Sequence, residues 1–272
     1  MQAGQAGVDP VKQAMRATWM SGDFGQIART YVKTAEAFVE RLKLEPGTRV
    51  LDVACGSGNL AIPAARAGAR VTGMDFAPNL LEEGREWARQ EGLDVTFDEG
   101  DAEQMQYVDG QFDTVMTMFG AMFAPRPERA AAELLRVCRQ GGTIAMANWN
   151  PGSFVSKMFG LGAKYLPPPE GVPSPLQWGD QDVVRQRFGS GVTDLRMTIR
   201  RAEFEFPYGP AGVVQLFRTY FGPVHMAFKR LDPPRQDLFA ADLQSLWRDH
   251  NEATGDRTVL HSEFLEVLAT RA

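Results

Sequence analysis

The sequence predicts an α/β fold in which a doubly wound, mostly parallel sheet of seven strands carries helices on both faces. Short apolar, β-branched segments alternate with longer segments of helical periodicity between residues 49 and 148. The first of these strands, 49–53, runs through a glycine-containing turn into a helix at 59–67. The chain has 272 residues, which is enough for such a core and for further elements around it.

Residues 1–44 are expected to form an N-terminal helical lid, with residues 1–8 disordered. Asp9 followed by proline is typical of a helix start and predicts a helix over 10–19. The apolar residues of 27–42 fall on one face and predict a second, longer helix. These helices either lie across a ligand or only cover the sheet edge. Three of their aromatic residues are accordingly either packing residues or ligand contacts: Trp19, Phe24 and Tyr31.

Residues 45–150 are expected to form the core of the sheet. Alternating strands and helices imply right-handed crossovers between parallel strands. Ligands in such sheets bind beyond the carboxyl ends of the strands, near the switch in strand order. Strands are predicted at 49–53, 70–74, 94–98, 112–118 and 142–148, and helices at 59–67, 79–91 and 127–139.

Residues 151–272 are expected to supply cap helices and the last two strands. The segment 165–175 contains five prolines, so it is extended and stiff, as an active-site loop or as a ligand for a partner domain. Strands are predicted at 193–206 and 258–270, and helices at 179–188, 210–221 and 233–252. A set of aromatic residues is either core or acceptor-pocket lining: Trp149, Tyr165, Trp178, Tyr220 and Phe221.

Composition restricts the partners that are expected. A net charge of −5 argues against nucleic acid, whose binding depends on Lys and Arg side chains that neutralise phosphates. The two cysteines, Cys55 and Cys138, cannot form a disulfide framework or a metal cluster by themselves, and no metal is expected. The N-terminus lacks a signal-peptide pattern, and no apolar run is long enough to span a membrane. We therefore expect a cytoplasmic protein with a small-molecule substrate; the oligomeric state is left open.

The turn after the first strand carries the most specific motif. Small residues there let backbone N–H groups and a helix N-terminus approach a small polar ligand. The segment 49–63 resembles motif I of the class I S-adenosylmethionine (SAM)-dependent methyltransferases, with an acid at the strand end and alanine in place of the first glycine. This departure is expected to cost little because alanine is nearly as small. The cofactor contacts that the resemblance implies here are Asp52, Ala54, Gly56, Gly58 and Asn59.

Two further motifs of this family follow at the ends of the next strands. Asp75 stands 17 residues after Gly58, and the resemblance implies that it binds both ribose hydroxyls while Phe76 lies against the adenine face. After the third strand, Asp101 would accept a hydrogen bond from the adenine amino group, and the backbone N–H of Ala102 would meet a ring nitrogen. The last residue of the fourth strand, Met118, and Phe123 in the loop after it would flank the methionine moiety.

The resemblance covers residues 45–150 and implies a Rossmann-like fold with SAM as cofactor. Within it, 129–142 is similar to the ubiquinone and menaquinone biosynthesis type of these enzymes. The glycine turn taken alone also matches a dinucleotide fingerprint, so an NAD-dependent oxidoreductase is the alternative enzyme class. Asp52 before the turn would repel a pyrophosphate, which favours SAM. A SAM-binding module without turnover is the third alternative.

Methyl transfer needs no protein nucleophile, so the absence of a catalytic triad is consistent with this activity. A small, apolar or aromatic acceptor is expected, with O, N, S or C as the methylated atom and small thiols included. Where the acceptor needs a base, His225 is the first candidate and Tyr220 the second.

Overall fold

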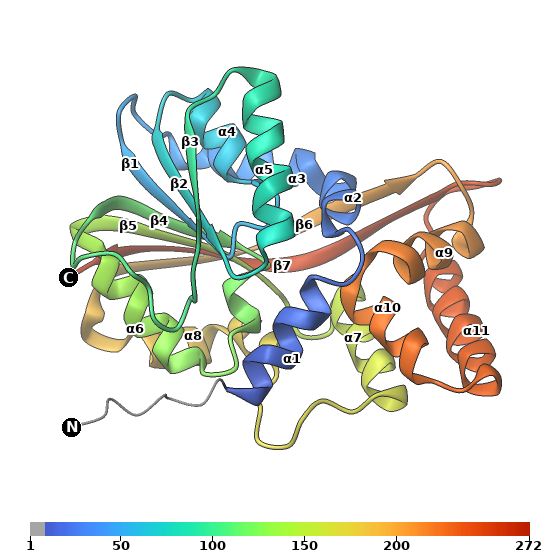
Figure 1. Cartoon of the computed structure of the whole chain (residues 1–272). Coiled ribbons are helices and arrows are strands. Elements are labelled where there is room, and N and C mark those ends of the chain that lie inside the picture. The colour runs from blue at the N-terminus through green and yellow to red at the C-terminus, as the bar shows by residue number, and fades with distance from the viewer. Residues whose placement is uncertain (1–8) are drawn as a thin grey trace, which may run out of the picture.

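The computed structural model describes residues 9–272, and the expectation for residues 1–8 lies outside this range. Within it, one sheet has the strand order β3-β2-β1-β4-β5-β7-β6 (Figure 1). The first five strands pair in parallel, and β7 is antiparallel to both β5 and β6. The strands are β1 (Arg49–Val53), β2 (Arg70–Asp75), β3 (Val95–Glu99), β4 (Phe112–Met118), β5 (Cys138–Trp149), β6 (Val192–Phe206) and β7 (Thr258–Arg271).

Helices cover both faces of this sheet. Figure 1 shows α3, α4 and α5 on one side and α6 and α8 on the other, while α7, α9, α10 and α11 gather beyond one end. The helices are α1 (Pro10–Trp19), α2 (Phe24–Ala28), α3 (Val32–Leu42), α4 (Ala61–Arg66), α5 (Pro78–Glu91), α6 (Pro127–Val137), α7 (Phe154–Tyr165), α8 (Gln181–Phe188), α9 (Pro210–Tyr220), α10 (Gly222–Arg230) and α11 (Pro233–Asp249). The predicted Rossmann-like fold is thus confirmed.

The long helix predicted over 27–42 is divided in the structure. Asp23 caps α2 through a hydrogen bond from the backbone N–H of Gln26 to its carboxylate. A 3₁₀ turn, η1 (Arg29–Tyr31), follows, and Tyr31 leaves the helical region at φ −130° before α3 begins. The apolar face continues across this break, which explains why its periodicity predicts one helix.

Two helices are present that the sequence analysis did not predict. The first, α7, starts at Ser153, whose hydroxyl accepts the N–H of Ser156, and glycines within it weaken the helical pattern. The second, α10, starts with Gly222-Pro223, a dipeptide that is typical of a turn but also suits the first turn of a helix. Both belong to the group of helices beyond the sheet.

Among residues 9–272, no helix has both the length and the hydrophobicity that crossing a bilayer requires. The same residues contain no group of three or more His, Cys, Asp or Glu side chains arranged to hold a metal ion.

Asp23 and Glu83 bring two carboxylates together where the N-terminal segment meets α5. Burial raises the pKa of the half-buried Glu83 to about 7, with a further contribution from the charge of Asp23. The folded state therefore holds this proton more tightly than the unfolded chain, whose glutamate pKa is near 4.5. The resulting stabilisation is complete below pH 4.5 and is lost as the pH rises through about 7.

We expect Glu83→Gln to raise the melting temperature at pH 8 by about 2–4 °C. This corresponds to a gain of about 1 kcal/mol in the free energy of unfolding, a figure that allows for the partial exposure of Glu83. The gain should disappear near pH 5, where the wild-type side chain is itself neutral. Thermal unfolding at a series of pH values measures this, with the exposed Glu82→Gln as control. An equal gain at both pH values would contradict the assignment.

Candidate functional site

A large cavity, here called the main cavity, lies at the carboxyl ends of β1, β2, β3 and β4. Its volume is about 970 Å³ when the open solvent at its mouth is included, and α1, α2 and η1 contribute to its lining. Ten of the eleven residues that the sequence analysis singled out as cofactor contacts line it: Asp52, Ala54, Gly56, Asn59, Asp75, Phe76, Asp101, Ala102, Met118 and Phe123.

Gly58 is the exception, because it faces the protein interior and does not line the main cavity. A Cβ at Gly58 would lie 3.2 Å from the Phe97 ring and 3.3 Å from Ile62, and its φ is +92°. This glycine therefore allows the turn to pack between β3 and α4. Its place in the motif reflects the path of the backbone, without a direct contact to the cavity.

Ala54 adopts a left-handed conformation with φ +54°. Because side chains larger than hydrogen strain this conformation by roughly 1–2 kcal/mol, the departure from glycine costs more than the size of the methyl group indicates. Gly120 packs directly against this residue, and a Cβ there would lie 2.4 Å from the carbonyl oxygen of Ala54. The turn after β1 and the loop after β4 thus fit together only with small residues.

Asp75 ends β2 and holds the turn after β1 in place. One carboxylate oxygen accepts the backbone N–H of Gly56 at 2.9 Å, and the other accepts the N–H of Ala77 at 2.9 Å. Burial raises the pKa of Asp75, and these backbone donors oppose the shift. Each oxygen keeps capacity for a further donor, so the carboxylate can bind ligand hydroxyls from its position in the cavity wall.

Asp52 is the second buried acid of the main cavity. Its carboxylate accepts the N–H of Ala61 at 3.0 Å, at the start of α4. Burial raises its pKa well above the usual range, the bond from Ala61 opposes this, and the charge of Asp75 adds to it. A cationic ligand beside these two acids would offset the cost of keeping both ionised.

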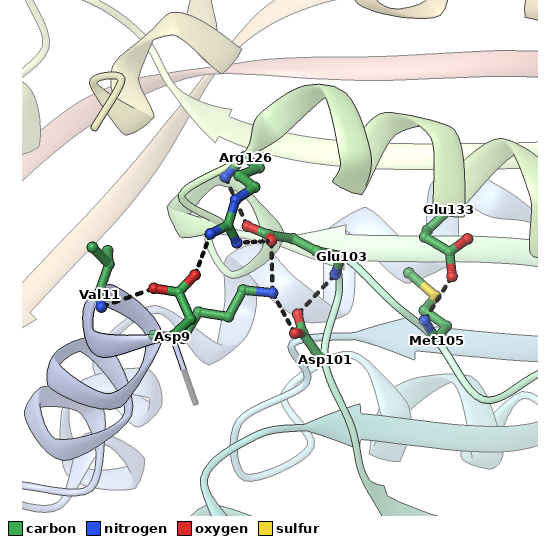
Figure 2. Close-up of polar contacts among 8 residues, drawn as sticks. Asp9, Val11, Asp101, Glu103, Met105, Arg126 and Glu133 are labelled. Atoms are coloured by element: carbon green, nitrogen blue, oxygen red, sulfur yellow. Dashed lines mark hydrogen bonds and ion pairs between the residues drawn. The ribbon is translucent and has the colours of Figure 1, made fainter. Parts of the chain in front are cut away.

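Asp101 follows β3 and belongs to a network with the N-terminal helix (Figure 2). Its Oδ1 accepts the N–H of Glu103 at 2.9 Å, and its Oδ2 contacts the Lys12 ammonium. Lys12 also lies 2.6 Å from Glu103 Oε2. The lysine side chain that lines the main cavity is therefore already paired with two carboxylates.

A second cavity, here called the aromatic cavity, adjoins the main cavity; its volume is about 450 Å³ when open solvent at its mouth is included. The two share Trp19, Phe24, Tyr31, Phe119 and Phe123 in their linings. The aromatic cavity is completed by Ile27, Trp149, Phe154, Val155, Met158, Phe159, Phe204, Phe217, Phe221 and Trp247. No described residue that lines it carries a formal charge at neutral pH.

Phe119 shapes the junction between the cavities. It holds the left-handed φ of +54°, which is unusual for a bulky residue, and its ring stacks on Trp149 with centroids 3.6 Å apart. Strained residues of this kind concentrate at binding sites. Of the aromatic set considered from the sequence, Trp149 and Phe221 line the aromatic cavity, whereas Tyr165, Trp178 and Tyr220 line neither cavity.

Tyr31 is the polar side chain at this junction, and the sequence analysis did not distinguish it from a packing residue. It is buried, lines both cavities, and lies edge-on to Phe119 and Phe204, with ring centroids 5.7 Å apart in each case. Burial raises its pKa, so the phenol stays protonated at neutral pH. A neutral phenol can donate a hydrogen bond to a ligand but is a poor base.

The two candidate bases do not lie at the cavities. His225 and Tyr220 line neither of them, and His225 Nδ1 is 2.9 Å from the carbonyl oxygen of Arg218. Phe217 of α9 and Phe221 line the aromatic cavity, but α9 ends at Tyr220 and the backbone is extended at Phe221. The cavities thus give no geometric support for a base at either position, and the role of both residues stays a prediction.

The charges of the residues that line the main cavity distinguish between ligands with a pyrophosphate and cationic ligands without phosphate. Asp52, Asp75 and Asp101 line it, and Lys12 is the lining cation among the described residues. Three carboxylates would repel a pyrophosphate, because Lys12 is already paired with Asp101 and Glu103. The same groups attract a ligand that carries positive charge and no phosphate.

Comparison with known proteins agrees with this geometry. Residues 50–142 match a family model described as a methyltransferase domain. An uncharacterized protein of Mycobacterium tuberculosis is 37% identical over 240 residues, which cover 86% of this chain and 87% of that protein. A demethylmenaquinone methyltransferase of Renibacterium salmoninarum is 36% identical over 116 residues, 43% of this chain and 47% of that protein.

One solved structure with a similar fold is that of phosphoethanolamine N-methyltransferase 2 of Haemonchus contortus in complex with S-adenosyl-L-methionine. That protein is 16% identical in sequence to this chain, and the two structures align with a TM-score of 0.61. The similarity covers 97% of this chain and 60% of that one.

Proposed function

Since this chain belongs to the class I SAM-dependent methyltransferases, whose cofactor is SAM, we propose that it methylates a small, apolar or aromatic acceptor held in the aromatic cavity. The observation that carries this proposal is the shared wall of the two cavities. An acidic cavity suited to a cation opens beside an uncharged aromatic one, with Tyr31 in the lining of both.

The residues of the main cavity fit SAM, which is cationic at its sulfonium and ammonium groups and has no phosphate. We assign the ribose hydroxyls to Asp75 and the adenine amino group to Asp101, with Phe76 against the adenine face and Met118 and Phe123 beside the methionine moiety. The open side of Gly56 supports this assignment, because the nearest atom to a Cβ placed there is 3.7 Å away on Phe24. The backbone of the turn can therefore approach a ligand closely.

SAM supplies a methyl group that is already activated by the sulfonium. The chain then has to hold the acceptor in line with that methyl group and exclude water. The aromatic walls provide the shape and the exclusion, and the Tyr31 phenol orients an acceptor oxygen or nitrogen by donating a hydrogen bond. Of the lid predicted for residues 1–44, the described part, 9–44, covers the site in this proposal, while residues 45–150 serve as cofactor-binding core and 151–272 as cap.

The lining of the aromatic cavity narrows the acceptor class. Burying a charged group without a partner is costly, and no described lining residue carries an opposite charge. An uncharged ring system, such as the quinone-related substrate named for the Renibacterium relative, therefore suits the cavity better than a phosphorylated amine.

A thermal-shift titration tests which cofactor binds, and a labelled methyl-transfer assay tests the activity. SAM or S-adenosylhomocysteine at 100 times its Kd should add about 2.7 kcal/mol of stability, and NADH should add none. Labelled SAM should then transfer its methyl group to members of a panel of uncharged phenols, quinols and thiols. Stabilisation by NADH alone would support the oxidoreductase alternative, and tight S-adenosylhomocysteine binding without transfer would support a binding module.

A further inference from the structure

The N-terminal helix α1 touches both cavities through one face. Lys12, Met15 and Trp19, spaced three and four residues apart, line the main cavity, and Trp19 also lines the aromatic cavity. No residue of α1 is fully buried. The helix is therefore held at its end by Trp19, which packs against the hydrophobic core, and at its start by polar contacts.

Those contacts gather at the first turn of α1 (Figure 2). Lys12 binds Asp101 and Glu103, and Asp9 binds the Arg126 guanidinium. Arg126 also donates to Glu103 from its side chain at 2.9 Å and from its backbone N–H at 2.7 Å. The Glu103 side chain is only 1% exposed, so its ion pairs are screened less by solvent and salt than pairs at the surface.

We propose that Lys12 is a positioning residue that docks α1 against the adenine-binding loop, so that Trp19 completes the wall of the acceptor site. This inference rests on the proposed function, because it takes Asp101 as the adenine contact. Lys12 and Trp19 are seven positions apart, which corresponds to roughly 10 Å along the helix axis. At the far end, Trp19 packs edge-on against Phe24, Phe123 and Phe221, with centroids 5.0–6.0 Å apart.

Cofactor binding and acceptor binding are coupled by this arrangement. Adenine bound at Asp101 orders the loop that carries both carboxylates to which Lys12 is paired. The ordered loop holds the start of α1, and the helix carries the constraint to Trp19. The acceptor therefore binds more tightly to the cofactor-loaded protein than to the free protein, and such coupling is reciprocal.

The test measures this coupling with 2-naphthol, a small uncharged phenol, as the acceptor probe. Its Kd is measured by calorimetry with and without saturating S-adenosylhomocysteine. We expect S-adenosylhomocysteine to tighten 2-naphthol binding by about tenfold in the wild type and by less than about twofold in Lys12→Met, with Lys12→Arg restoring most of the effect. Arg16→Met is the matched control, because Arg16 lies on the same helix and, among residues 9–272, forms an ion pair only with the exposed Glu99.

Hydrogen exchange gives a second readout that needs no acceptor. S-adenosylhomocysteine should slow amide exchange in residues 10–19 of the wild type and of Arg16→Met, but not of Lys12→Met. The inference would be overturned if S-adenosylhomocysteine increased the affinity for 2-naphthol equally in Lys12→Met and in the wild type. It would also be overturned if the wild type did not bind 2-naphthol, or bound it with an affinity that S-adenosylhomocysteine does not change. Failure of the proposed function is distinct, because S-adenosylhomocysteine would then stabilise none of these proteins.

Discussion

Replacing Asp75 by alanine is expected to weaken SAM and S-adenosylhomocysteine binding by about 1–3 kcal/mol, or roughly five- to 150-fold in Kd. The carboxylate is assigned to the ribose hydroxyls and also accepts the backbone N–H groups of Gly56 and Ala77. Its removal therefore takes away ligand contacts and leaves two donors of the turn without their acceptor. The loss should appear in Kd measured by calorimetry below the melting temperature of the variant.

Two further variants show whether the weaker cofactor binding results from the loss of the Asp75 carboxylate. Asp75→Asn keeps the shape of the side chain and one acceptor oxygen, so its Kd should lie between those of the wild type and Asp75→Ala. Glu99→Gln changes an acid at the end of the neighbouring strand that does not line the main cavity, and its Kd should remain that of the wild type. An unchanged Kd in Asp75→Ala would remove Asp75 from the cofactor site.

Tyr31→Phe is expected to lower kcat by about ten- to 100-fold while the Kd for S-adenosylhomocysteine stays within about twofold. The substitution removes the hydroxyl at the junction of the cavities and keeps the ring that packs against Phe119 and Phe204. Because burial raises the pKa of Tyr31, the wild-type rate should show no ionisation of this phenol between about pH 6 and 9. Single-turnover methyl transfer from labelled SAM separates this effect from product release.

His225→Ala is the comparison for Tyr31→Phe. Because His225 lines neither cavity, its removal should leave turnover near that of the wild type. A wild-type rate in Tyr31→Phe would reduce Tyr31 to a packing residue. A large loss of turnover in His225→Ala, with S-adenosylhomocysteine binding retained, would place His225 in the reaction after all.

The core and most of the residues that line the main cavity were predictable because local sequence determines them. Strand periodicity places Asp52, Asp75 and Asp101 at the ends of successive parallel strands, and parallel strands present those ends at one edge of the sheet. Ten of the eleven predicted contacts accordingly meet in the main cavity. The sequence did not reveal the positive φ of Ala54, because backbone strain depends on how the turn fits against Gly120.

The lining of the aromatic cavity, in contrast, depends on tertiary packing. Tyr31, Phe119 and Trp247 are far apart in the sequence and have no common motif, yet they line one cavity. The break between α9 and α10 moves His225 away from it, although the sequence places His225 only four residues after Phe221.

The sequence by itself thus determined the sheet, the turn after β1 and the acids at the strand ends, because each depends on residues close together in the chain. The tertiary structure alone decided which aromatic rings line the aromatic cavity and that Lys12 reaches Asp101. Those contacts join segments up to about 200 residues apart, and their geometry arises only when the lid and cap helices pack onto the same edge of the sheet.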